Sequence, residues 1–150
     1  LNQPRLTELM LQLRKASGCL YFERRTEGEQ LKAAMKTPRI VLGLLADQNA
    51  GDHGLWLPVF GRETSVSPAP AVFAQRYRCR VFTSACFRTS PGRWTIELGE
   101  EIPVRENGKR RSTEAITRDI IAAQEETILR DPANWFWVHN RWKPRPQAHE

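Results

Sequence analysis

The sequence predicts an α/β fold in which helices flank a mixed sheet. Helix-like and strand-like segments alternate over the first half of the chain, as they do in α/β proteins. The run Ile40–Ala46 is continuously apolar and of strand length, which is typical of a strand buried on both faces of such a sheet. The 150 residues fit one domain, to which we assign residues 1–146, with a polar tail at 147–150.

Two helices are predicted before this apolar run. Arg5–Ala16 carries apolar residues at i, i+3, i+4 and i+7, and Gly18 suits the end of the helix. A second helix, Glu27–Lys36, should end before Pro38, because the residue preceding a proline avoids the α conformation. Between the two helices, Cys19–Phe22 has the composition of a short strand.

Turn and capping residues predict the later elements. Residues 89–92 are typical of a hairpin turn, so Arg80–Phe87 and Arg93–Leu98 are expected to pair. Ser112 or Thr113 should cap a helix that runs to Leu129. Three further predicted elements are a weak strand at Leu55–Phe60, a helix at Pro70–Arg76 and a short helix opened by Asp131–Pro132.

The charge balance favours anionic partners. The chain has 23 Lys and Arg against 17 Asp and Glu, a net charge of +6, which suits phosphate groups, an acidic protein or an anionic membrane face. With 40% hydrophobic residues, the composition excludes disordered and collagen-like classes. Three cysteines without a C-x-x-C pair indicate neither a disulfide framework nor a zinc site.

The loop Asp47-Gln48-Asn49 is the strongest local candidate for a site. It follows the predicted buried strand at its carboxyl end, where open α/β sheets bind ligands. An acid there can orient a base, accept a hydroxyl proton or hold a metal, but Asp and Asn also occur in loops for backbone reasons alone. A calcium loop is excluded, because its twelfth position would be Pro58 instead of Glu.

Two basic clusters occur in the second half of the chain. We interpret Lys109-Arg110-Arg111 as a solvated basic face. The tail cluster combines cations with aromatic side chains: Trp135, Trp137, Arg141, Trp142, Lys143 and Arg145. Arginine binds phosphate, and tryptophan suits membrane interfaces or stacks on planar groups, so this cluster is interpreted as a ligand-binding or membrane-binding feature.

These motifs together resemble a known family. Asp47-Gln48-Asn49, Gly54, Pro58-Val59-Phe60-Gly61, Ala69-Pro70, Ala74 and Trp137-x-His139-x-Arg141-Trp142-Lys143 follow the order and spacing of the bacterial lipid A biosynthesis acyltransferases, the lauroyl/myristoyl transferases. The resemblance extends from about Leu1 to Pro146. It implies transfer of a fatty acyl chain from acyl carrier protein to a hydroxyl of a phosphorylated glycolipid, the lipid A precursor. We expect neither a cofactor nor a metal. The resemblance also implies a glycerolphosphate-acyltransferase-like sandwich and a location at the cytoplasmic face of the cell inner membrane.

The sequence departs from the family at the catalytic base. The family uses a His-x4-Asp/Glu dyad, in which the acid orients the imidazole that deprotonates the acceptor hydroxyl. Here His53 leads to Pro58, His139 leads to Pro144, and no residue stands five positions after His149. In the family the dyad lies upstream of the region matching Leu1. We therefore expect this chain to be a C-terminal portion of the acyltransferase domain that lacks base and membrane anchor and is inactive alone.

The resemblance assigns roles to two residues, and five others are candidates for substrate binding. Asp47 matches the family acid of the D-x-[ND] loop and is expected to organise the active-site loop, and Arg14 is expected to bind a phosphate of donor or acceptor. Substrate-binding roles are expected for Gln48, Asn49, His139, Arg141 and Lys143. For the last three, two possibilities stay open: they either hold a lipid phosphate or close the fold at the C terminus.

A basic module that binds nucleic acid or phosphate without catalysis is the alternative. Its support is the combination of Trp and Arg residues in a basic chain. Against it, the sequence has no RNP, helix-turn-helix or zinc pattern. We therefore expect no nucleic-acid partner.

Overall fold

The computed structural model describes residues 3–22 and 26–145 of the chain. They belong to two compact units, an N-terminal unit of Leu1–Leu42 and a C-terminal unit of Gly43–Glu150. Helices and strands both occur, which confirms the mixed α and β composition that the sequence predicts. The predicted tail at 147–150 lies outside the described residues.

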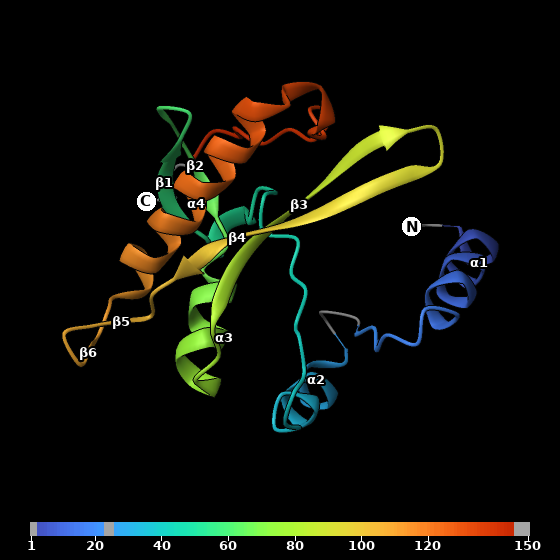
Figure 1. The fold of residues 1–150 in the computed structure, drawn as a ribbon, viewed down its shortest axis with the longest axis horizontal. Coiled ribbons are helices and arrows are strands. Elements are labelled where there is room, and N and C mark those ends of the chain that lie inside the picture. Colours follow the sequence, from blue (N-terminus) through green and yellow to red (C-terminus); the bar gives the residue numbers. More distant parts are fainter. Residues whose placement is uncertain (1–2, 23–25, 146–150) are drawn as a thin grey trace, which may run out of the picture. The chain divides into compact units, whose positions relative to one another are not determined.

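The N-terminal unit holds the two predicted helices, α1 (Pro4–Lys15) and α2 (Gly28–Ala34) (Figure 1). A proline in the first turn of α1 suits the start of a helix, and Arg14 and Lys15 in its last turn suit the negative end of the helix dipole. The strand predicted at Cys19–Phe22 is wrong, because residues 19–22 are irregular. A four-residue segment becomes a strand only where a neighbouring strand takes its backbone hydrogen bonds.

The apolar run Ile40–Ala46 is not a strand either, so this prediction is wrong. Val41 is 93% and Leu45 is 88% exposed, and only Ala46 at the end of the run is buried. A segment with this composition becomes a doubly buried strand only where neighbouring strands pair with it and a layer covers each face of the sheet. None of the strands in the described part of the chain pairs with these residues.

The described residues form three separate two-stranded sheets instead of one mixed sheet. The antiparallel pairs are β1 (Leu55–Val59) with β2 (Arg62–Val66), β3 (Val81–Ser90) with β4 (Arg93–Ile102), and β5 (Arg105–Glu106) with β6 (Lys109–Arg110). Two connections, Phe60-Gly61 and Asn107-Gly108, have positive φ at both residues, as in the tight turns favoured by hairpins. Such short connections allow only antiparallel pairing, since parallel strands need a long crossover.

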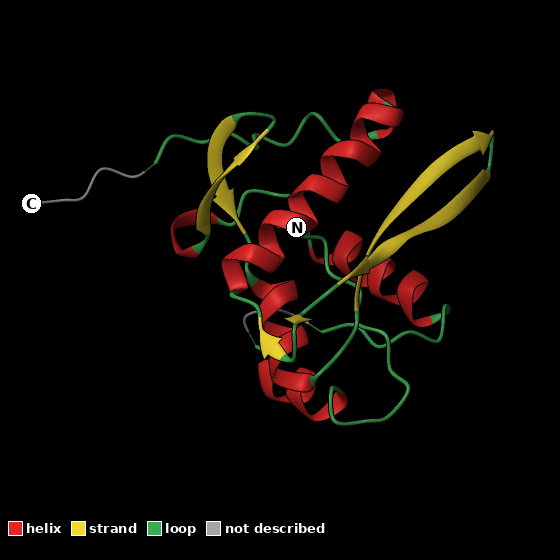
Figure 2. Ribbon diagram, turned by 60° about the vertical axis from the view of Figure 1, so that its left-hand side comes forward, coloured by secondary structure: helices red, strands yellow, loops and turns green. Residues whose placement is uncertain are grey.

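The β3–β4 ribbon confirms the hairpin predicted from residues 80–98. Its strands pair from Val81 opposite Ile102 to Ser90 opposite Arg93, which makes both longer than predicted. Figure 2 shows the turn end of this ribbon projecting beyond the rest of the C-terminal unit. Only the base of the ribbon, at Val81 and Ile102, is buried.

Helix α4 (Thr113–Arg130) connects the two hydrophobic cores of the C-terminal unit. Ser112 Oγ accepts a hydrogen bond of 3.0 Å from Ala115 N–H, which confirms the predicted N-cap. One core contains Ile116 and Ile120 of α4, Ala71 and Ala74 of α3 (Ala69–Tyr77), and Val81 and Ile102 of the ribbon. The other contains Ile121 of α4 with Leu57, Val59 and Val66 of the β1–β2 hairpin. Helix α4 therefore fixes that hairpin relative to α3. It is followed by a single 3-10 turn, η2 (Pro132–Asn134), where the sequence predicts a short helix.

Replacing Ile116 by alanine is expected to destabilise the C-terminal unit. Ile116 is 0% exposed, so Ile116→Ala leaves a cavity and should lower the free energy of unfolding by about 2–5 kcal/mol. Urea denaturation followed by tryptophan fluorescence reports on this unit, because all five tryptophans belong to it. Leu129→Ala, on the same helix at 66% exposure, should change the value by no more than about 0.5 kcal/mol. Equal losses for the two variants would contradict the proposed core.

Candidate functional site

The loop Asp47-Gln48-Asn49 is held by residues far away in the sequence. Asn49 Nδ2 donates to Arg141 O at 2.9 Å and to Thr64 Oγ1 at 3.3 Å. Asn49 N–H donates to His139 Nε2 at 2.9 Å, and Asn49 Oδ1 accepts from Gly51 N–H at 2.9 Å. Both ends of the amide are thus used, one to shape the loop and the other to attach it to the tail. The structure therefore brings together the two motifs that stand about ninety residues apart.

Arg141 is the most deeply buried charged group of this cluster. It is 2% exposed, and its Nη1 donates to Gln48 O at 2.9 Å and to Ser65 O at 2.6 Å. Burial lowers the pKa of the Arg141 guanidinium from its ordinary value, and the Asp47 carboxylate opposes this shift. A buried charge is tolerated when carbonyl oxygens take its hydrogen bonds. In this structure the guanidinium joins the loop, the hairpin and the tail.

Strand β2 supports the loop from the other side. Ser65 O also accepts from Ala50 N–H at 3.2 Å, and Ser65 Oγ donates to Gly51 O at 2.5 Å. Gly54 makes this close approach possible, since a Cβ at this position would lie 2.8 Å from both Ala50 Cβ and Val66 O. Residues 47–54 are therefore fixed in place by the hairpin.

Asp47 contacts the aromatic residues of the tail. Its Oδ2 accepts a hydrogen bond of 3.0 Å from Trp135 Nε1. The Trp135 ring lies 4.5 Å from Trp137 and 6.1 Å from Trp142, with edge-to-face geometry in both pairs, and 6.2 Å from Phe60. The Asp47 side chain is half-buried, and in the described part of the chain its Oδ1 accepts no hydrogen bond. One carboxylate oxygen is thus fixed by the indole, while the other has no hydrogen-bond donor among the described residues.

His139 is used as an acceptor inside the cluster. Because its Nε2 accepts from Asn49 N–H, the neutral ring carries its proton on Nδ1. The Nε2 atom would have to give up its hydrogen bond with Asn49 N–H before it could remove a proton from a substrate. In this arrangement His139 positions the loop.

The remaining predicted site residues have exposed side chains. Gln48 enters the network only through its carbonyl, and Lys143 lies in the exposed tail. Arg14 belongs to α1 of the N-terminal unit, where its guanidinium lies 5.4 Å from the centre of the Tyr21 ring. The ligand-binding roles of these residues stay predictions.

Two residues of the cluster were not predicted from the sequence. Thr64 and Ser65 lie on β2, a strand absent from the prediction, whereas Trp135 belongs to the predicted tail cluster. Thr64 Oγ1 donates to Arg141 O at 2.5 Å, so both hydroxyl residues carry the loop and the tail. Gly61, directly after the predicted strand Leu55–Phe60, was an available sign of a turn and hence of a following strand.

The described part of the chain contains neither a metal-binding cluster nor a membrane-spanning helix. No three His, Cys, Asp or Glu side chains gather there so as to hold a metal ion. Among the described helices, none combines the length and the apolar composition that crossing a bilayer requires.

Residues 1–144 match the bacterial lipid A biosynthesis acyltransferase family. The matched region contains both the Asp47-Gln48-Asn49 loop and the tail through Lys143, and the chain belongs to this family. The resemblance found in the sequence is thereby confirmed, and with it an acyltransferase of lipid A biosynthesis at the level of the family. No curated protein and no solved structure matches the chain significantly.

Removing the buried guanidinium tests which of the two open roles Arg141 has. Arg141→Met removes the guanidinium donor of Gln48 O and leaves Ser65 O with Ala50 N–H alone, so it should lower the free energy of unfolding by about 1–3 kcal/mol. Lys143→Met, which removes the same charge from an exposed position, should change it by no more than about 0.5 kcal/mol. Urea denaturation measures both. Equal stabilities of the two variants would favour a ligand-binding role for Arg141 over closure of the fold.

Proposed function

We propose that this chain contributes to the transfer of a fatty acyl group from acyl carrier protein to a hydroxyl of a phosphorylated lipid A precursor. The proposal places the reaction at the cytoplasmic face of the cell inner membrane. The observation that carries it is the hydrogen-bonded union of the Asp47-Gln48-Asn49 loop with the His139 and Arg141 tail, within a family match over residues 1–144. The net charge of +6 suits an acidic carrier protein and a phosphorylated acceptor.

The chemistry requires a base that removes the proton of the acceptor hydroxyl. None of the three histidines here is followed by an acid at the spacing of the family dyad. His139 Nε2 is bound to the Asn49 backbone, and Asp47 is fixed by Trp135. In our proposal, Asp47 organises the active-site loop, Arg14 binds a phosphate of donor or acceptor, and these 150 residues alone do not complete the reaction.

The exposed apolar run before the loop supports a role in a larger sheet. Val41 and Leu45 are 93% and 88% exposed, an arrangement that is unfavourable in water. We propose that in the catalytic assembly the run Ile40–Ala46 is a strand of a glycerolphosphate-acyltransferase-like sandwich. The Asp47 loop would then leave the carboxyl end of that strand, where ligands bind in α/β sheets.

The purified 150-residue chain is expected to show no acyl transfer. Without a His-x4-Asp/Glu dyad no residue activates the acceptor hydroxyl, so the rate should equal the protein-free rate. The assay follows a radiolabelled acyl group from acyl carrier protein to a lipid A precursor by thin-layer chromatography, with a dyad-containing member of the family as positive control. Turnover above the protein-free rate would overturn the claim that these residues need a base from elsewhere.

Translating the coding DNA upstream of Leu1 would show whether a His-x4-Asp/Glu motif lies in the same reading frame. If it does, the corresponding polypeptide is the protein in which the site residues are tested. If it does not, a family member that supplies the dyad in a fusion serves the same purpose.

In such a dyad-containing polypeptide, Asp47→Asn is expected to lower kcat by about 10²-fold. The amide oxygen can still accept from Trp135 Nε1, so this variant removes the charge but keeps the indole contact. Asp52→Asn, an exposed acid in the same loop region, is the matched control and should stay within about twofold.

Arg14→Ala should raise KM about tenfold in the same assay because a phosphate contact is lost, while Arg5→Ala on the same helix should not. If the Asp47 and Arg14 variants transfer acyl groups at nearly the rate of the unmodified protein, the two residues do not have the proposed roles.

A further inference from the structure

A hollow lies between α3 and the β5–β6 hairpin, and it shares no residue with the Asp47 loop. Its volume is about 410 Å³, and the six lining residues are Ala74, Gln75, Arg78, Val104, Arg105 and Arg110. Pockets that bind small molecules measure roughly 300–1,000 Å³. The hollow is therefore large enough to take a small molecule or the head group of a larger one.

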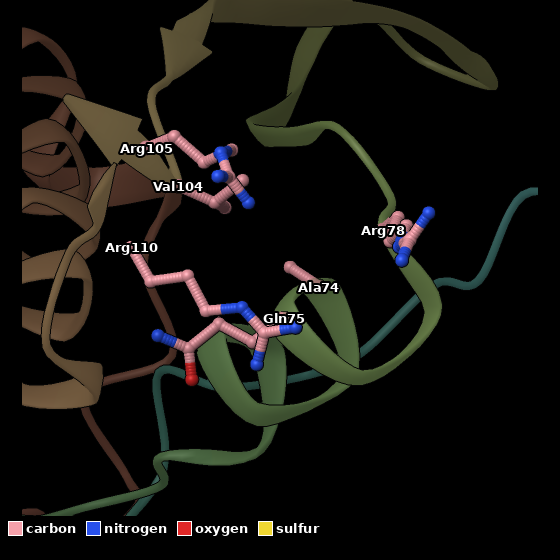
Figure 3. A pocket seen from close by; sticks show the side chains of 6 residues that line it. All are labelled: Ala74, Gln75, Arg78, Val104, Arg105 and Arg110. Carbon is pink, nitrogen blue, oxygen red and sulfur yellow. The ribbon is translucent and has the colours of Figure 1, made fainter. Parts of the chain in front are cut away.

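Three arginines from different segments line this hollow, which we name the arginine pocket. Figure 3 shows Arg105 and Arg110 extending from the hairpin toward α3, with Arg78 on the opposite side. None of the six lining residues is acidic. Within the described residues, Arg78 and Arg110 form no ion pair, whereas the neighbouring Arg111 is bound to Asp119 at 2.7 Å. Two of the three arginines therefore have no carboxylate partner in the described part of the chain.

Hydrogen bonds that do not involve the side chains of the three lining arginines hold the walls of the pocket together. Gln75 Nε2 donates to Arg111 O at 2.7 Å, and Gln75 Oε1 accepts from Thr113 Oγ1 at 3.1 Å, which ties α3 to the start of α4. Arg111 N–H donates to Val104 O at 3.2 Å. These bonds fix the base of the hairpin against α3, so the spacing across the pocket is set by the fold.

Two of the arginines are also positioned locally. Arg78 has a left-handed backbone (φ 56°) at the end of α3, where Cys79 N–H donates to Ala74 O at 3.0 Å. Arg105 Nη2 donates to Gly108 O at 2.5 Å across the hairpin turn. Arg105 thus keeps its charge at the pocket while one of its donors braces the turn.

We propose that the arginine pocket binds a phosphate group carried by a molecule with an apolar surface. Guanidinium groups present paired donors that match phosphate oxygens, and three of them suit a doubly charged anion better than a single carboxylate. The half-buried Val104 provides apolar contact beside these charges. Such a phosphate belongs either to a soluble phosphorylated compound or to a lipid head group. The proposal does not depend on acyl transfer, so it stands or falls separately from the function proposed above.

Titration calorimetry of the complete 150-residue chain with pyrophosphate tests the pocket. The double variant Arg78→Gln with Arg110→Gln removes two charges that bind nothing else in the described structure, so folding should be retained, which circular dichroism checks. The matched control is Arg88→Gln with Arg93→Gln, two exposed arginines near the turn of the β3–β4 ribbon. At one salt concentration, the pocket variant should raise Kd about tenfold or more, and the control less than about twofold.

Equal weakening by the two double variants would show attraction to net charge alone and would overturn the pocket. The absence of pyrophosphate binding up to millimolar concentration would also overturn it, as would equally tight binding of citrate.

Two further probes distinguish the source of the phosphate. Binding of a soluble sugar phosphate that is lost only in the pocket variant indicates a soluble ligand. Sedimentation with vesicles of phosphatidic acid in phosphatidylcholine that is lost only in the pocket variant indicates a lipid head group. If both double variants bind the sugar phosphate and the vesicles as well as the unmodified chain does, the proposal is contradicted.

Discussion

The buried guanidinium of Arg141 is the interaction on which the candidate site depends. A charge that is 2% exposed must have its hydrogen bonds taken up, and here the acceptors are a loop carbonyl at Gln48 and a strand carbonyl at Ser65. The backbone carbonyl of the same arginine accepts from Asn49 and Thr64. Loop, hairpin and tail therefore stabilise one another, because displacing any of them leaves a buried polar group unpaired.

The β1–β2 hairpin is able to carry this network because it combines buried apolar side chains with buried hydroxyl side chains. Apolar residues Leu57, Val59 and Val66 pack with Ile121 of α4 and hold the hairpin in the core. The buried hydroxyl residues Thr64 and Ser65 of β2 take the hydrogen bonds of the loop and tail. An isolated two-stranded hairpin is at best marginally stable in water, so this support comes from α4. The position of Asp47 thus depends on a helix that contributes no residue to the site.

Signals confined to a few residues were sufficient to predict several elements. The Ser112 cap and the Pro91-Gly92 turn each specify a local conformation, and both are found where expected. The strand predicted at Ile40–Ala46 is wrong because an apolar composition indicates only how a strand would be buried. It does not show that neighbouring strands are present to pair with it. Strand β2 was missed because its centre, Thr64-Ser65, is polar although it is buried, which breaks the expected alternation. The joining of Asn49 to His139 involves residues ninety positions apart, and no local pattern encodes it.

The two basic clusters illustrate why charge in a sequence does not identify a binding site. In the tail cluster the Arg141 guanidinium already donates to protein carbonyls, and the Trp142 indole donates to Val59 O at 3.1 Å. In Lys109-Arg110-Arg111, interpreted from the sequence as a solvated face, Arg111 pairs with Asp119 whereas Arg110 lines a pocket beside two other arginines. Arg110 and Arg111 are adjacent in the sequence, but only the guanidinium of Arg111 is already bound to a carboxylate of the protein. An arginine can bind an external anion strongly only where its donors are still available, and that availability is decided by the tertiary structure.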